Sequence, residues 1–157
     1  MAPLTVSPGL SALHELLPRA VTWAESQEHS ILLQGRPLTT VELSLAMAVE
    51  VHRPELIRVS FVERLPMPQD AELARAAHEA GLLGPRMVGL TIGYGIYVVI
   101  GHGSSRLLSH ECRHVHQYEV AGSIQSFLLQ YLDQVIRVGY AAAPFEVDAR
   151  NWERDWP

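Results

Sequence analysis

Residues 108–117 read LSHECRHVHQ, and this stretch carries the strongest structural signal in the chain. Within it, residues 110–114 form an H-E-x-x-H sequence in a segment that is compatible with a helix. Positions four apart on an α-helix differ by about 40° around the axis and about 6 Å along it. His110 and His114 are therefore predicted to point to one side and to share one Zn²⁺ ion. Glu111 lies at the edge of that face, where it can take a proton from a metal-bound water without being a ligand.

The alternative is a polar helix face that carries two exposed histidines. Apolar residues flank the motif, namely Leu107, Leu108 and Val115, and a glycine-rich, strand-like stretch precedes it. Both features favour the metal site over the exposed polar face.

Two histidines and a water leave a tetrahedral zinc ion one protein ligand short. The acidic residues after the motif are Glu119, Asp133, Glu146, Asp148, Glu153 and Asp155. Glu119 lies about 180° from the histidine face of the same helix, so it is predicted to point away. Glu146 is the preferred third ligand, because it begins a separate helix after a turn that can bring the chain back. Asp148 would face the opposite side of that helix and is the alternative.

Other residues near the motif are assigned from their position on the helix. Gln117 lies about 20° from the first histidine and is predicted either to hydrogen-bond a ligand or to cap a groove. Cys112 faces away from the metal and is predicted to be a packed core thiol. His116 is not expected to be a ligand. Tyr140 is the candidate catalytic donor to a developing oxyanion, with a packed aromatic side chain as the alternative.

Composition restricts the class of protein. The 157 residues are 48% hydrophobic and 18% charged, which fits a single domain over residues 1–157 with a real core. One cysteine excludes an internal disulfide and a Cys₄ or Cys₂His₂ zinc site. The net charge of −5 argues against nucleic acid as a partner. All 12 basic residues are arginine, which indicates GC-rich coding and a bacterial protein.

No targeting or membrane segment is expected. The N-terminus lacks the basic region of a signal peptide. The longest uncharged stretch, residues 87–105, has a strongly apolar part of about 15 residues, short of the ~20 that span a bilayer. Its aromatic and β-branched residues favour a strand, so we expect a cytoplasmic protein without a membrane partner.

The pattern along the chain predicts an α+β fold that is mainly helical, with a small twisted sheet packed on the active-site helix. A loose arm is expected over residues 1–10. Helices are expected over 11–17, 18–33, 71–80, 123–138 and 144–153, one beginning at Thr39 or Thr40, and one beginning at Ser104 or Ser105 with the H-E-x-x-H motif. Strands are expected over 56–65 and 87–100, the second broken at Gly93 or Gly95.

Three segments resemble a known family: residues 108–117, residues 139–140 and residues 144–149. They are similar to the zinc metallopeptidases called gluzincins, and most similar to the small single-domain minigluzincins. The resemblance covers about residues 88–150 and implies that Glu146, in a Glu-x-x-Ala sequence, is the third zinc ligand. It also implies an edge strand at 89–99 that pairs with an extended substrate.

Two positions depart from the family pattern. His116 stands where an apolar residue is common in these relatives. Arg150 stands four residues after Glu146, where an Asp or Asn would orient a histidine. Arg150 is instead expected to contact Glu146 or a substrate carboxylate.

The resemblance implies zinc-dependent hydrolysis of peptide bonds, with peptides or proteins as substrates and endopeptidase activity favoured over exopeptidase activity. Residues 71–157 would form the catalytic part, and residues 1–70 would be a helical part that carries no resemblance. A zinc-binding interaction or regulatory domain without turnover is one alternative. A metallohydrolase acting on a non-peptide amide, such as a formyl group, is another.

Overall fold

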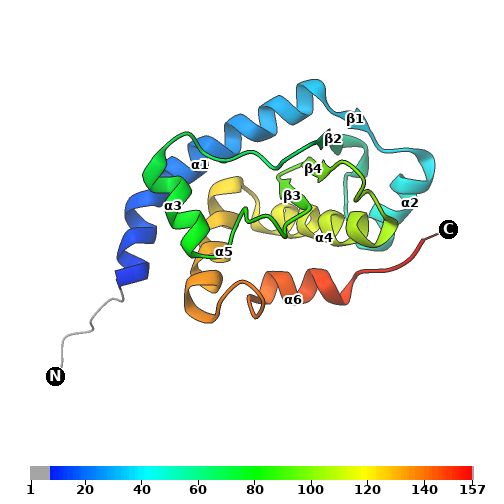
Figure 1. Ribbon diagram of the computed structural model, residues 1–157. Helices are drawn as coiled ribbons and strands as arrows, with labels where there is room; N and C mark the ends of the chain where they lie inside the picture. The colour runs from blue at the N-terminus through cyan, green and yellow to red at the C-terminus, as the bar shows by residue number, and fades with distance from the viewer. Residues whose placement is uncertain (1–7, 157) are drawn as a thin grey trace.

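The computed structural model describes residues 8–156, and Figure 1 shows the arrangement of its elements. Residues 1–7 of the expected N-terminal arm lie outside the described residues. The elements are α1 Pro8–Gln34, β1 Arg36–Pro37, α2 Thr40–Ala48, the 3-10 helix η1 Pro54–Leu56, β2 Arg58–Val62, α3 Ala71–Glu79, β3 Gly89–Ile92, β4 Gly95–Val99, α4 Ser105–Ala121, α5 Ile124–Val138 and α6 Pro144–Asn151. The predicted α+β class is confirmed, with mostly helical elements around one small sheet.

The sheet has the strand order β1-β2-β4-β3, which leaves β3 at an edge. The central pair, β2 and β4, is parallel, and the other two pairs are antiparallel. The predicted break in the second strand is confirmed, because Gly93 turns the chain between β3 and β4. Its φ of +60° is a backbone conformation that favours glycine. The two-residue strand β1 was not predicted.

The two faces of the sheet are covered by different helices. Along β4, Ile96 and Val98 point into the core shared with α2 and α4. The alternate residue Tyr97 points to the other side, where its hydroxyl donates to Gln27 of α1. Figure 1 shows α1 and α4 on opposite sides of the strands. Helix α4 therefore lies directly beneath β3 and β4.

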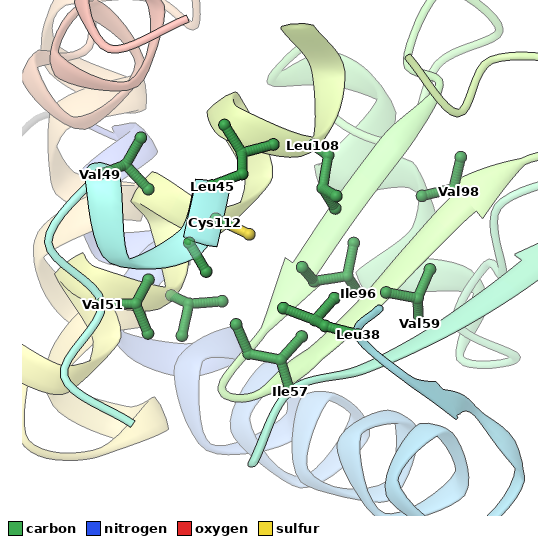
Figure 2. Packing of buried hydrophobic residues seen from close by; sticks show 12 residues of the cluster. Leu38, Leu45, Val49, Val51, Ile57, Val59, Ile96, Val98, Leu108 and Cys112 are labelled. Atoms are coloured by element: carbon green, nitrogen blue, oxygen red, sulfur yellow. The ribbon is translucent and has the colours of Figure 1, made fainter. Parts of the chain in front are cut away.

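The main core lies between α2, α4 and the sheet. Figure 2 shows its side chains, which include Leu38, Leu45, Val49, Val51, Ile57, Val59, Ile96, Val98, Leu108 and Cys112. Cys112 is fully buried in this cluster, so the prediction of a packed core thiol is confirmed. Burial also raises the pKa of its thiol, which keeps it neutral.

The N-terminal part contains the strand that was expected within residues 56–65, and its pairing was not predicted. Strand β2 comes from residues 1–70, yet it pairs with β4 from the later part of the chain. The expected division at residue 70 therefore does not follow a boundary of the sheet. The sequence missed this because parallel pairing depends on contacts between segments far apart in the chain.

Helix α1 also differs from the prediction, which placed a break at Pro18. The structure has one helix from Pro8 to Gln34 with Pro18 inside it. Pro18 itself is exposed and costs this helix one backbone hydrogen bond. None of the described helices combines the length and apolar character needed to cross a membrane.

The helix that carries the H-E-x-x-H motif has defined ends. Ser104 caps α4 by accepting a hydrogen bond from the Leu107 N–H. Gly122 ends it with a φ of +88°, and Ser123 caps α5 immediately afterwards. After this sharp corner α5 packs against α1 and α4, and α6 then packs against α4 and α5.

Candidate metal centre

Two helices bring the three predicted ligands together. His110 and His114 come from successive turns of α4, and Glu146 comes from the first turn of α6. One ligand atom of each lies within 4.8 Å of the others. Glu146 approaches the His110 Nε2 to 3.2 Å and the His114 Nε2 to 3.1 Å. The side chains are only 12%, 9% and 3% exposed, in the order His110, His114, Glu146.

Both imidazole rings are oriented by partners behind them. The His110 Nδ1 lies 2.9 Å from a carboxylate oxygen of Glu153, which can only accept a hydrogen bond when ionised. The His114 Nδ1 lies 2.7 Å from the Gln117 Oε1. The Gln117 Nε2 donates to the Phe145 carbonyl and to Asp148, which assigns its oxygen to the histidine. Each Nδ1 is thus a donor, so each Nε2 points toward the cluster and is the atom that could bind a metal ion once it carries no proton.

This donor set fits a divalent metal ion. Two imidazole lone pairs and an acidic oxygen converge on one point, where they repel one another unless a cation or a proton lies between them. Two nitrogens and one carboxylate oxygen are ligands that zinc takes in catalytic sites, with one position left open. Hydrogen-bonded partners behind ligating histidines are the usual companions of such sites.

The contacts within the cluster keep its carboxylate ionised. Burial acts to raise the pKa of Glu146, but hydrogen bonds from both imidazoles outweigh it and hold that pKa well below its usual range. Burial acts to lower the pKa of His114, but the Glu146 carboxylate and the charge of Glu111 together raise it to about 9. The Glu146 carboxylate is therefore ionised at neutral pH and is paired with a proton on His114, which a metal ion would displace.

Glu111 lies next to the cluster without belonging to it. Its side chain is buried, and its Oε2 accepts a hydrogen bond of 2.7 Å from the Thr91 hydroxyl of β3. Its Oε1 is packed against the backbone of Gly89, where an added Cβ would lie 2.5 Å from it. The edge strand thus sets the position of this carboxylate. Thr91 and Gly89 were not predicted to have this role, although their spacing of two places them on one face of the strand.

Two tyrosines lie near Glu146. The Tyr131 hydroxyl of α5 donates a hydrogen bond of 2.9 Å to the Glu146 Oε2. Tyr131 was not predicted to have this role, although a buried phenol usually needs a polar partner. Tyr140 lines the same cavity as the cluster, and burial and the Glu146 charge raise its pKa. Tyr140 is therefore a neutral donor at the site.

The remaining candidates lie elsewhere. Asp148 pairs with Arg113 and Gln117, outside the three-residue cluster. Glu119 points away, as predicted, and accepts from the backbone N–H groups of residues 52 and 53. The His116 Nδ1 contacts the Glu50 carbonyl. The expected contact of Arg150 with Glu146 is not found. Arg150 instead donates to the Ala141 carbonyl at the turn before α6.

A cavity of about 500 Å³ adjoins the cluster. His110, Glu111, His114 and Glu146 form one part of its wall, and β3 lines it as well. The rest of the wall is mostly apolar and comes from α1, α3, α5 and the segment before β3. The site therefore opens onto a space that can hold a ligand.

Comparisons of the chain with protein-family models, with curated proteins and with solved structures found no match. The functional argument for this chain consequently rests on its own residues and their geometry.

Proposed function

We propose that this protein is a zinc-dependent peptide hydrolase. The observation that carries the proposal is the convergence of His110, His114 and Glu146, with the Glu111 carboxylate held beside them by Thr91. A site that only holds a metal has no need of a further buried acid at its edge. The resemblance of residues 88–150 to gluzincins supports the same activity. The cytoplasmic location of the protein stays a prediction.

Each residue then has a defined role. The ion would be held by the His110 Nε2, the His114 Nε2 and a Glu146 oxygen. Glu153 and Gln117 would fix the orientation of the two imidazole rings. When bound, zinc polarises the scissile carbonyl and lowers the pKa of a water molecule toward ~7. Glu111 takes a proton from the attacking water at its Oε1 and passes it to the leaving amine nitrogen.

The substrate would enter as an extended chain. Strand β3 is at the edge of the sheet and lines the cavity, so its backbone groups can pair with a peptide. Tyr140 lies in the same wall and is kept neutral, so its hydroxyl can donate to the developing oxyanion.

Metal analysis combined with one substitution tests the proposal. Wild type and Glu111→Gln are purified without chelators, their zinc content is measured, and both are incubated with denatured protein substrates. We expect equal zinc content and a loss of cleavage by about 10²–10⁴-fold in the variant, the range for removal of a general base. Zinc in both proteins with no cleavage by wild type would favour a binding domain without turnover.

A further inference from the structure

The cavity beside the candidate metal centre is much larger than the space that a single substrate side chain would fill. Its volume is about 500 Å³, whereas a cavity of roughly 150 Å³ already holds a benzene molecule. There is thus room for about three groups of that size. A substrate that fills this space contributes several bulky groups at once.

The chemistry of the wall selects apolar groups. Helices α1 and α3 contribute Ala20, Trp23, Leu73 and Ala77, and α5 contributes Leu128 and Leu132. None of these side chains carries a charge, so apolar groups placed among them leave water without losing hydrogen bonds. The alanines matter most, because their short side chains leave the space that a ligand can occupy.

The charged groups of the wall argue against an anionic ligand. The acids that line the cavity are Glu79, Glu111 and Glu146, and no arginine is among the described lining residues. The chain contains no lysine at all. A fatty-acid carboxylate or a lipid phosphate would find no arginine or lysine there, and the only basic side chains among the described lining residues, His110 and His114, already contact Glu146. A peptide backbone is neutral and can pair with β3.

We propose that this cavity binds a run of about three apolar residues in the substrate, so that the site acts on strongly apolar peptide segments. This inference rests on the proposed function, because it names the substrate class of that site. Helices α1 and α3 precede residues 88–150, the part of the chain that resembles gluzincins. Their residues Ala20 and Ala77 determine the selectivity for apolar substrate residues, because their small side chains leave space in the cavity.

Binding can be measured separately from catalysis. The full-length Glu111→Gln chain is titrated with acetyl-Leu-Phe-Leu-amide and with acetyl-Ser-Gly-Ser-amide, and tryptophan fluorescence is recorded. Trp23 lines the cavity, whereas Trp152 and Trp156 pack against the main core, so a Trp23→Phe variant identifies the source of the signal. We expect the apolar peptide to bind at least about tenfold more tightly than the polar one.

Variants that fill the cavity provide the decisive comparison. Ala77→Phe and Ala20→Phe, introduced separately, should each weaken binding of the apolar peptide by at least about tenfold. Arg75→Phe places the same ring on an exposed position of α3 and should leave binding unchanged. Two filling variants from different helices guard against misfolding of one, and thermal unfolding of each verifies its fold.

Three results would overturn the inference: equal affinity for both peptides, unchanged binding in both folded filling variants, or tighter binding of palmitate than of the apolar peptide. Apolar binding without zinc or cleavage would instead reject the proposed hydrolysis and leave the cavity assignment standing. Cleavage of polar and apolar peptides with equal kcat/KM would reject the cavity assignment and leave the hydrolysis standing.

Discussion

Gln117 connects helix α6 to the ring of His114 by hydrogen bonds. Its oxygen accepts from the His114 Nδ1, and its nitrogen is held by the Phe145 carbonyl and by Asp148 of α6. The amide cannot rotate without losing all three hydrogen bonds. It therefore fixes the tautomer that directs the Nε2 lone pair toward the cluster.

Replacement of this amide should weaken metal binding while the metal ligands stay in place. We expect Gln117→Leu to bind zinc about 10–100-fold more weakly than wild type, the range for loss of a partner behind a ligating histidine. Affinity is measured by competition with a chelating dye, and circular dichroism verifies helix content. His116→Gln is the matched control, since His116 contacts the Glu50 carbonyl rather than the cluster. Equal affinities in Gln117→Leu and wild type would contradict this role.

The three residues of the proposed metal site were predictable from the sequence because their geometry is local. His110 and His114 share a face through the helical period alone, and Pro144 marks the start of the helix that carries Glu146. The partners Thr91, Tyr131 and Glu153 come from other elements, and only tertiary packing brings them to the cluster. Their residue types are common in strands, helix stripes and chain ends, so no spacing identified them.

At the scale of elements, β3 and α4 are fitted to each other at Gly89. A Cβ at this position would meet the Glu111 side chain, so the strand can lie this close to the helix only with glycine there. The position of the carboxylate relative to the metal ligands thus depends on the edge strand as much as on its own helix.

A methyl group at this contact should impair catalysis and spare metal binding. We expect Gly89→Ala to displace Glu111 and to lower kcat by roughly 10²-fold, as displacements of about 1 Å in catalytic groups do. Zinc content should remain that of wild type. Gly84→Ala is the matched control, because no atom lies within 4 Å of a Cβ placed at that glycine. An unchanged kcat in Gly89→Ala would argue that Glu111 does not act from this position.

Helix α2 illustrates a boundary that the sequence predicted well. Thr39 and Glu42 form the reciprocal hydrogen bonds of a capping box, and Arg36 pairs with Glu42. The hydrogen bond from Arg36 lowers the pKa of Glu42 below its reference value of 4.5. Because the folded-state pKa is depressed, the resulting stabilisation is present above the unfolded pKa and is lost as pH falls through the folded pKa.

The stability of this cap should consequently depend on pH. We expect Glu42→Gln to lower the free energy of unfolding by about 0.5–1 kcal/mol at pH 7, and by progressively less below pH 4.5. Urea denaturation of both proteins at pH 7 and at lower pH measures the difference. Glu25→Gln, on an exposed position of α1, should have little effect at either pH. A difference that does not change with pH would rule out a contribution from the Glu42 charge.

At the scale of the whole molecule, the candidate centre lies where α4, α5 and α6 meet β3. Hydrogen bonds join Glu146 of α6 to α4 and to Tyr131 of α5, and Thr91 joins β3 to α4. An ion bound here would hold two parts of the chain, α4 and α6, to one another.

The cavity is also a property of the whole fold. Sequence periodicity gave no indication of it, because its wall combines segments that are distant in the chain.

Zinc should therefore stabilise the folded protein. At a free zinc concentration about 100 times the Kd, linkage predicts about 2.7 kcal/mol of added stability. For a chain of this size that raises the unfolding midpoint by roughly 5–10 °C. Differential scanning calorimetry with zinc and with a chelator measures the shift. His114→Ala should abolish it, and the same shift in His114→Ala as in wild type would place the ion elsewhere.

The most direct test of the central claim is the position of zinc itself. Anomalous diffraction at the zinc edge, on crystals grown from protein purified without chelators, locates the ion without reference to activity. We predict one peak per chain, about 2.0–2.1 Å from the Nε2 atoms of His110 and His114 and about 2.0–2.2 Å from a Glu146 oxygen. No peak at this cluster, in protein supplied with zinc, would contradict the proposed metal site and the function built on it.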